Sequence, residues 1–288
     1  MSSGYITVAC GHRRYLEMAT DLALSLREHD EKPVALVLDE ELRPAASDRH
    51  LSAFDHVVPL PAGYPPFLSK LAAPRATPFE RSFFIDADCL AIGSLRDLWG
   101  GVEASDFAVQ GRYVGAGEDH EHHFLSTAAL VRNFGLGRYL RHNAGILYFR
   151  REAGRAVSAA CMRLWEDDFR RQIPFDEPLR GLVGERFGIA TIPKPYPMAW
   201  WPNLVAPGET KFRLVHFMGP LLPETLTWLL HAVRRRRRAA GIPWREGVLA
   251  WINKATRGRI PWLPQRFPHL AHAGALAEKN VALAALTG

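Results

Sequence analysis

Cysteines are scarce in this chain: Cys10, Cys89 and Cys161 are the only three among 288 residues, and they stand far apart. An odd and scattered set does not build a disulfide framework, so we expect reduced thiols and a cytoplasmic location. Long apolar runs are missing too, since no stretch approaches the roughly 18 residues that a membrane-spanning helix needs. The first ten residues also lack the basic region and apolar run of a secretory signal. Neither a secreted disulfide-rich protein nor an integral membrane protein is expected.

Excess charge is small once one run of arginines is set aside. The formal net charge is +6, and the five arginines at 234–238 supply most of it, which leaves +1 (6 − 5) for the rest of the chain. Proteins that bind nucleic acid usually spread their Lys and Arg side chains over a whole face. We therefore expect no nucleic-acid partner.

The sequence does contain the alternating strand and helix patterns of a soluble α/β protein. Apolar residues make up 48% and charged residues 23%, which are ordinary values for a globular domain. Strands that alternate with amphipathic helices predict a largely parallel sheet with helices on its faces. We divide the chain into an α/β body, 1–222, and a basic, aromatic C-terminal extension, 223–288. The expected strands are 4–10, 33–39, 56–60, 82–86, 143–149 and 211–217, and the expected helices are 13–30 and 152–172.

Two aspartates, Asp86 and Asp88, follow an apolar strand with only Ala87 between them. Two carboxylates held close together repel each other unless a cation or a shared proton offsets their charge. Alternate residues of a strand project to the same side, so both carboxylates can bind one hard cation beyond the strand's carboxyl end. Such a cation can bridge a diphosphate and neutralise charge on a departing phosphate.

Other readings of this D-x-D motif exist. Aspartate is common in turns at strand ends and needs no function there. Phosphatases of the haloacid dehalogenase class also place D-x-D after an apolar strand, but close to the start of the domain and followed by Gly-Thr. Here the motif comes after several expected strands, and CLAIGSL follows it.

Six segments of the chain carry a family resemblance when they are taken in order. They are ITVACGHRRYLEMATDLALSLREH, FLSKLAAP, FFIDADCLAIGSLRDLW, RHNAGILYFRR, FDEPLRGL and VHFMGP. This ordered set resembles the nucleotide-sugar glycosyltransferases of the GT-A fold, most closely family 8, the glycogenin and lipopolysaccharide galactosyltransferase group. The resemblance covers about residues 4–220. It implies a GT-A catalytic domain that transfers a sugar from a nucleoside-diphosphate sugar, with UDP-sugar the first guess, to an acceptor hydroxyl with retention of configuration.

The resemblance also implies roles for individual residues. Asp86, Asp88 and His216 would bind Mn²⁺ or Mg²⁺, and mixed carboxylate and imidazole ligands suit Mn²⁺. Without the resemblance, His216 on an alternating strand would be read as a structural histidine. Asp176 and Glu177 would be the catalytic carboxylates near the reacting sugar, whereas the residues alone also allow Asp176 to cap a helix. The nucleotide-sugar site would comprise Ala9, Gly11, His12, Tyr15, Lys70, Asp86, Ala87, Asp88, Asn143, Gly145 and Gly219.

The chain departs from the family pattern in two places. The family usually continues His-Phe-x-Gly with Lys-Pro-Trp, and that Lys contacts the diphosphate, whereas Gly219 is followed here by Pro-Leu-Leu. The family's Asp-Gln-Asp segment is replaced by Asp176-Glu177-Pro178. These changes leave open a catalytically silent protein that only binds a nucleotide sugar.

Two further segments have expected roles outside the donor site. GEDHEHH at 117–123 could hold zinc, but its position between the metal motif and the Asn-Ala-Gly strand favours an acceptor-side loop. The extension combines Trp and Leu with cations, in TWLLHAVRRRRR and REGVLAWINKATRGR. Interfacial helices on anionic membranes have this composition, so peripheral association with the inner membrane face is one expectation. The other is that the arginine run is a solvated face or a disordered linker.

Overall fold

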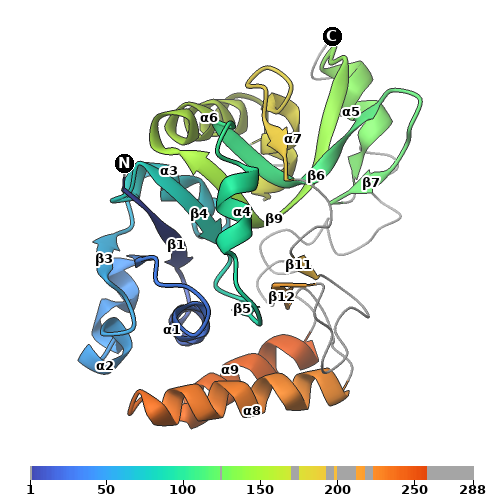
Figure 1. Cartoon of the computed structure of the whole chain (residues 1–288). Coiled ribbons are helices and arrows are strands. Elements are labelled where there is room, and N and C mark those ends of the chain that lie inside the picture. Colours follow the sequence, from blue (N-terminus) through green and yellow to red (C-terminus); the bar gives the residue numbers. More distant parts are fainter. Residues whose placement is uncertain are drawn as a thin grey trace.

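The computed structural model describes residues 2–123, 125–169, 175–192, 198–199, 212–217 and 223–257. A seven-stranded sheet in the order β10-β6-β9-β4-β1-β2-β3 forms the centre of the molecule (Figure 1). β9 is antiparallel to both of its neighbours, whereas β4, β1, β2 and β3 pair in parallel, as β10 and β6 do. The strands are β1 (Ser3–Ala9), β2 (Val34–Leu38), β3 (His56–Pro59), β4 (Arg81–Ile85), β6 (Phe107–Gly115), β9 (Arg138–Arg150) and β10 (Ala190–Thr191).

The predicted α/β architecture is confirmed, and most predicted strands lie within a residue or two of the observed bounds. The main omission is β6, which none of the expected strands covers. Gly111 interrupts the strand pattern of its sequence. A Cβ atom there would lie 2.5 Å from the Arg141 carbonyl oxygen of the paired strand, so the close approach of β6 and β9 requires glycine.

Helices cover both faces of the sheet, because successive side chains of each strand point to opposite sides. One face packs on α1 (Arg13–Arg27) and α4 (Arg96–Gly101), through side chains such as Tyr5, Phe83 and Tyr148. The other face packs on α3 (Ala73–Ala76), α5 (Thr127–Asn133), α6 (Arg151–Leu164) and α7 (Asp176–Val183). The remaining short helical segments are the 3-10 turns Glu40–Ala45 and Pro66–Ala72, α2 (Asp48–Leu51) and a π-helical turn, Trp165–Phe169.

A second, three-stranded sheet lies at the edge of the main one. It has the order β11-β12-β5, with β11 at Met198–Ala199, β12 at Leu214–His216 and β5 at Cys89–Ala91. β12 and β5 are antiparallel, and His216 is paired with Cys89. The expected late strand, 211–217, is therefore present in shortened form. This pairing carries the end of the α/β body back to the D-x-D motif. A two-stranded ribbon, β7 (Glu121–His122) with β8 (Leu125–Ser126), lies in the His-rich stretch.

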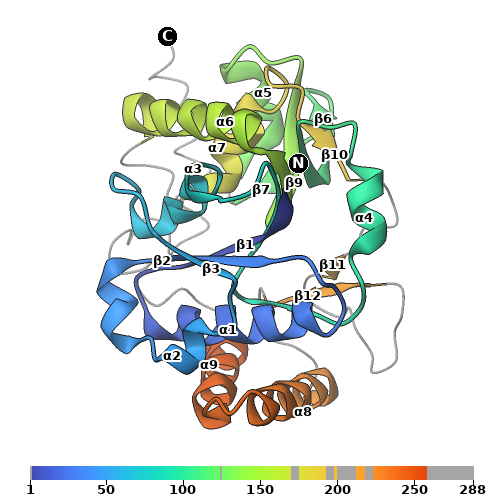
Figure 2. The same cartoon turned by 60° about the vertical axis from the view of Figure 1, so that its left-hand side comes forward.

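The first part of the C-terminal extension is a helical hairpin, α8 (Pro223–Ala239) and α9 (Trp244–Arg257), that packs against α1 on the side away from the sheet (Figure 2). Its buried contacts include Phe217, Leu229, Val233 and Trp251, and full burial of such a side chain contributes about 1.5–3 kcal/mol. None of the helices in the described residues is both long and apolar enough to cross a membrane.

Two arginines of the run at 234–238 lie on the face of α8 that packs against α1, and they are buried there. Arg237 is fully buried and Arg236 nearly so, whereas Arg234, Arg235 and Arg238 are exposed. The expectation of a solvated face or a disordered linker is therefore wrong for the two buried residues. Arg237 can be buried because it lies between two carboxylates of α1, on Glu17 and Asp21. The composition of the run alone does not reveal these partners.

Candidate active site

The D-x-D carboxylates and His216 meet at one point, although they are far apart in the sequence. His216 Nε2 lies 3.1 Å from Asp88 Oδ1 and 3.5 Å from Asp86 Oδ2. The pairing of β5 with β12 brings them together, and the Phe217 amide donates to the Asp88 carbonyl at 2.9 Å. The three groups predicted to bind a metal are thus adjacent and almost fully buried.

The two aspartates converge for a reason other than the one that the sequence pattern suggested. β4 ends at Ile85, so Asp86 is not the last residue of a strand, and Asp86, Ala87 and Asp88 form a tight turn before β5. The Cys89 amide closes this turn by donating to the Asp86 carbonyl at 3.0 Å. The turn, and not the alternation of a strand, places both carboxylates on one side.

Asn143 and Gly145 of β9 hold the imidazole of His216 in place. Asn143 Oδ1 accepts from the Gly145 amide at 2.8 Å and lies 3.2 Å from His216 Nδ1. Because this amide oxygen can only accept, Nδ1 is the donor in this contact, and the ring is oriented so that Nε2 faces the aspartates. A Cβ atom on Gly145 would lie 2.5 Å from His216 Nδ1, so only glycine leaves room for the ring.

This donor set fits a divalent cation. One imidazole nitrogen lies within 3.5 Å of an oxygen of each of the two carboxylates, and a positive charge between these groups offsets the repulsion between the aspartates. Oxygen ligands with one imidazole nitrogen suit Mn²⁺, and the Asn143 contact is the outer-shell hydrogen bond that orients a ligating histidine.

Two lysines contact the same carboxylates from opposite ends of the chain. Lys70 Nζ lies 2.7 Å from Asp86 Oδ2, and Lys254 Nζ of α9 lies 2.9 Å from Asp88 Oδ2. Burial raises the pKa of Asp86, and Lys70 offsets this only in part. Burial also acts to raise the pKa of Asp88, but Lys254 and His216 outweigh it and lower that pKa below its usual range. Lys70 was among the residues predicted for the donor site, whereas Lys254 was missed because it lies in the extension, outside the resemblance.

The four residues predicted for the nucleoside pocket lie around the turn between β1 and α1. Ala9 ends β1, Gly11 has a φ of 73°, and His12 caps α1 by accepting from the Arg14 amide at 3.1 Å. Tyr15 follows in the first turn of α1 and is half-buried. Gly11 is exposed and adopts a backbone conformation that favours glycine.

Asp39 is a residue of this region that the sequence did not single out. Its Oδ2 accepts from the Gly11 amide at 3.0 Å, and its amide donates to the Ala9 carbonyl at 3.0 Å. It directly follows β2, as Asp86 follows β4. That position, at the carboxyl end of a parallel strand, is the signal that could have identified it.

Asp176 and Glu177 begin α7 and are buried on the Lys70 side of the site. Phe175 occupies the N-cap position of this helix and makes no side-chain capping bond, so Asp176 is not the cap. Asp176 pairs instead with Arg180, one turn later, at 2.7 Å. Glu177 Oε1 accepts from the Ala144 amide at 2.6 Å, which ties α7 to the Asn-Ala-Gly segment of β9.

The predicted acceptor-side loop, 117–123, also reaches Glu177. His123 Nε2 forms a very short contact with Glu177 Oε2, and His122 Nε2 lies 3.3 Å from the same oxygen. His122 also contacts the Tyr139 hydroxyl at 2.6 Å, so it is firmly placed. His123 has a φ of 50°, a left-handed conformation that is uncommon outside glycine. These two histidines and Glu177 are close enough to share a metal ion, so the zinc alternative for this loop stays open. Gly219, the last predicted donor-site residue, lies outside the described residues.

Together, the parallel strands that end at the D-x-D turn, the antiparallel β9 and the returning β12 define the GT-A fold of nucleotide-sugar glycosyltransferases, as the sequence resemblance predicted. Solved structures with this architecture include the apo form of the bifunctional glycosyltransferase WbbM, with a TM-score of 0.56 and 13% identity over 88% of this chain. The chain spans 52% of the length of WbbM. The galactosyltransferase LgtC, solved with donor and acceptor sugar analogs, gives a TM-score of 0.55 and 13% identity over 85% of this chain and 99% of LgtC. An active-site mutant of LgtC gives the same TM-score at 12% identity.

No protein-family model matches the sequence, and no curated protein matches it. At these identities the structural likeness establishes the fold, which is the part of the resemblance that the comparisons confirm.

Proposed function

We propose that this protein is a metal-dependent glycosyltransferase that moves a sugar from a nucleoside-diphosphate sugar, with UDP-sugar as the first candidate, to an acceptor hydroxyl. The observation that carries the proposal is the convergence of Asp86, Asp88 and His216 at the D-x-D turn of a GT-A fold. LgtC, which shares the fold, was solved with donor and acceptor sugar analogs.

Asp86, Asp88 and His216 would hold the divalent cation. When bound, the cation neutralises the charge that develops on the departing diphosphate. Lys70 is adjacent to Asp86 and adds a second positive charge on the donor side. The turn from Ala9 to Tyr15 borders this region from the carboxyl end of β1, where open α/β sheets bind ligands.

Asp176 and Glu177 are the carboxylates that we assign to the sugar side of the site. Both are buried, and Lys70 is close enough to affect each of them electrostatically. An ionised carboxylate at this place stabilises positive charge on the anomeric carbon of an oxocarbenium-like transition state. Retention of configuration is part of the proposal because the family resemblance implies it.

The test of the proposed function is a thermal-shift screen of UDP, GDP, CDP and TDP, each with and without Mn²⁺. A ligand that binds only the folded state raises its melting temperature by mass action. We expect one diphosphate to stabilise the protein in a metal-dependent manner. If none does so, the assignment of the D-x-D turn to a nucleotide sugar is wrong.

Turnover separates the proposed enzyme from its two alternatives. A glycosyltransferase releases the nucleoside diphosphate from its donor sugar when an acceptor is present. A silent binding protein shows the thermal shift without turnover, and a D-x-D phosphatase releases phosphate from simple phosphoesters instead.

Replacing His123 by Ala is expected to move the acid limb of the pH–activity profile to higher pH. Burial acts to raise the pKa of Glu177, but His123 and His122 outweigh it and hold that pKa well below its usual value. Loss of His123 raises the pKa of Glu177, so the carboxylate needed for catalysis is protonated earlier during acidification. The measurement is donor turnover against pH, with His120→Ala, in the same loop, as the control. Superimposable profiles for the two variants would exclude this role of His123.

The exposed face of the hairpin carries a basic stripe, which we define as His231, Arg234, Arg235 and Arg238. These residues are spaced as one face of α8 and line an open hollow of about 460 Å³. The Arg234 guanidinium lies over the Trp244 ring at 4.4 Å, and Leu249 of α9 is 48% exposed. We propose that this surface binds anionic membranes, because cations interspersed with aromatic and apolar side chains match a lipid headgroup layer.

Liposome flotation tests the membrane proposal. The protein is expected to float with vesicles that contain anionic lipid and to remain behind with neutral vesicles. The double substitution Arg235→Glu and Arg238→Glu should abolish flotation, whereas Arg43→Glu, at an exposed site on the 3-10 turn after β2, should not. Equal recovery with both vesicle types would leave the stripe as a solvated face.

A further inference from the structure

Lys254 brings the C-terminal extension into the candidate active site. It lies on α9, and its ammonium group is 2.9 Å from Asp88 Oδ2, on a side chain that is only 22% exposed. Its position is fixed by Trp251, which lies one turn earlier on the same helix and is fully buried. The Trp251 indole donates to Asp21 Oδ2 of α1 at 2.8 Å, so α9 is anchored beside the site.

The charge balance at Asp88 shows what this lysine does before a ligand arrives. Asp88 has two nitrogen neighbours, His216 Nε2 on one oxygen and the Lys254 ammonium on the other. A divalent cation that binds Asp86 and Asp88 has to compete with Lys254 for the Asp88 carboxylate. The positive charge of Lys254 also opposes a second positive charge within a few ångströms.

The position of the Lys254 ammonium becomes favourable once a diphosphate is present. A diphosphate held by a cation on Asp88 would bring its oxygens close to that carboxylate, and the Lys254 ammonium already lies beside it. An ammonium group is a strong donor to phosphate oxygens, and such charge-assisted contacts are stronger than neutral ones. The segment after His216 supplies no alternative, because residues 218–222 read Met-Gly-Pro-Leu-Leu and contain no cation.

We propose that Lys254 is the diphosphate-binding cation of this protein: it neutralises Asp88 in the ligand-free site and transfers to the diphosphate of the donor when metal and nucleotide bind. The inference rests on the proposed function, and it assigns part of the donor site to the helical hairpin. It predicts effects of opposite sign on two ligands, which a purely structural role for Lys254 does not.

Calorimetric titration of the full-length protein tests this proposal with Lys254→Met, which keeps an apolar stem and removes the charge. Mn²⁺ alone should bind the variant more tightly than the wild type, because the competing ammonium is gone. The nucleoside diphosphate that stabilises the wild type should bind the variant about 10- to 100-fold more weakly in saturating Mn²⁺, the range for one hydrogen bond to a charged group. Lys254→Arg should restore most of the diphosphate affinity.

Arg245→Met is the matched control, since Arg245 is an exposed cation on the same helix. Both of its affinities and its melting temperature should equal those of the wild type, whereas Lys254→Met should melt at a lower temperature because Asp88 loses an ion-pair partner. Unchanged or weaker Mn²⁺ binding by Lys254→Met, or unchanged diphosphate binding, overturns the proposal. If the wild type itself binds none of the four diphosphates, the proposed function fails, and the Mn²⁺ titration still decides whether Lys254 competes for Asp88.

Discussion

Asp88→Asn is expected to lower metal-dependent glycosyl transfer by about 100- to 1000-fold, the effect of losing a central electrostatic contact in a buried site. Asp88 is in contact with both His216 and Lys254, so its replacement removes a proposed metal ligand and leaves the Lys254 ammonium without its carboxylate. The amide has the shape of the carboxylate but not its charge, which confines the change to electrostatics. Turnover with saturating donor and Mn²⁺ is the measurement.

The stability of the Asp88→Asn variant should be measured in parallel, so that loss of activity is not confused with loss of fold. Asp97→Asn is a suitable control, because Asp97 lies in the exposed first turn of α4, a short distance along the chain. Full turnover by Asp88→Asn, or turnover without any divalent metal, would refute the assignment of Asp88 as a metal ligand.

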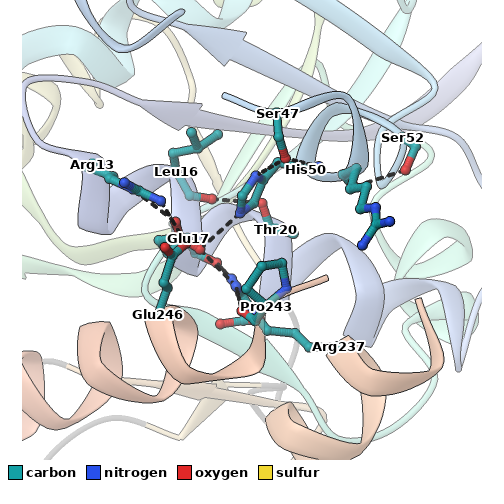
Figure 3. A network of polar contacts seen from close by, with 12 residues as sticks. Arg13, Leu16, Glu17, Thr20, Ser47, His50, Ser52, Arg237, Pro243 and Glu246 are labelled. Atoms are coloured by element: carbon teal, nitrogen blue, oxygen red, sulfur yellow. Dashed lines mark hydrogen bonds and ion pairs between the residues drawn. The ribbon is translucent and has the colours of Figure 1, made fainter. Parts of the chain in front are cut away.

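Arg237→Met is expected to destabilise the protein by about 3–5 kcal/mol, because removal of one partner leaves buried charges without compensation. Arg237 is fully buried between α1 and the hairpin (Figure 3). Its Nη1 donates to Glu17 Oε2 at 2.7 Å and its Nη2 to the Glu17 carbonyl at 2.6 Å, while its Nε contacts Asp21. Glu17 keeps His50 as a neighbour at 3.2 Å, whereas the Asp21 carboxylate keeps only the Trp251 indole as a side-chain donor within the part of the chain that the structure describes.

Acidification should reduce the loss of unfolding free energy that the Arg237→Met variant shows relative to the wild type. Burial raises the pKa of Asp21 to about 6 even with Arg237 present, from an unfolded value of 3.8. Loss of Arg237 raises this pKa further, so the folded variant binds a proton that the unfolded chain does not, and lower pH favours folding. Urea unfolding at pH 8 and pH 5.5 measures both effects.

Arg238→Met serves as the control for Arg237→Met, because Arg238 is the neighbouring arginine and is exposed. It should cost less than about 0.5 kcal/mol, the usual range for surface substitutions. A similar loss for both variants would mean that the hairpin depends on the run as a whole and not on the buried ion pairs.

The sequence predicted those elements whose structure depends mainly on their own residues. Strands β1, β2 and β4 are short apolar runs, and the periodic apolar residues of α1 match the face that it buries. The D-x-D pair could be singled out because two neighbouring carboxylates repel each other, and this repulsion has to be offset by a cation or a shared proton. The family resemblance supplied the order of the remaining parts, including the placement of His216 beside the aspartates, which the structure reproduces.

What the sequence did not predict depends on contacts between distant segments. Lys254 is 166 residues (254 − 88) beyond Asp88, and no periodicity links them. In sequence, Arg237 cannot be told from the exposed arginines 234, 235 and 238 of the same run, and only the helix phase and the carboxylates of α1 make it a buried residue. Strand β6 was missed because Gly111 serves a close approach to β9 that can be seen only when both strands are present.

Because β5 pairs with β12, the proposed donor site can form only late in the synthesis of the chain. A ribosome emits Asp86 and Asp88 long before His216, which lies 128 residues after Asp88, and longer still before Lys254. Domains generally fold as units and synthesis starts at the N-terminus, so a nascent chain that ends before β12 contains both aspartates without His216 or Lys254. Contacts of such long range also form slowly. A chain that ends before β12 would consequently lack His216 and Lys254, so the proposed donor site can be complete only after synthesis has passed α9.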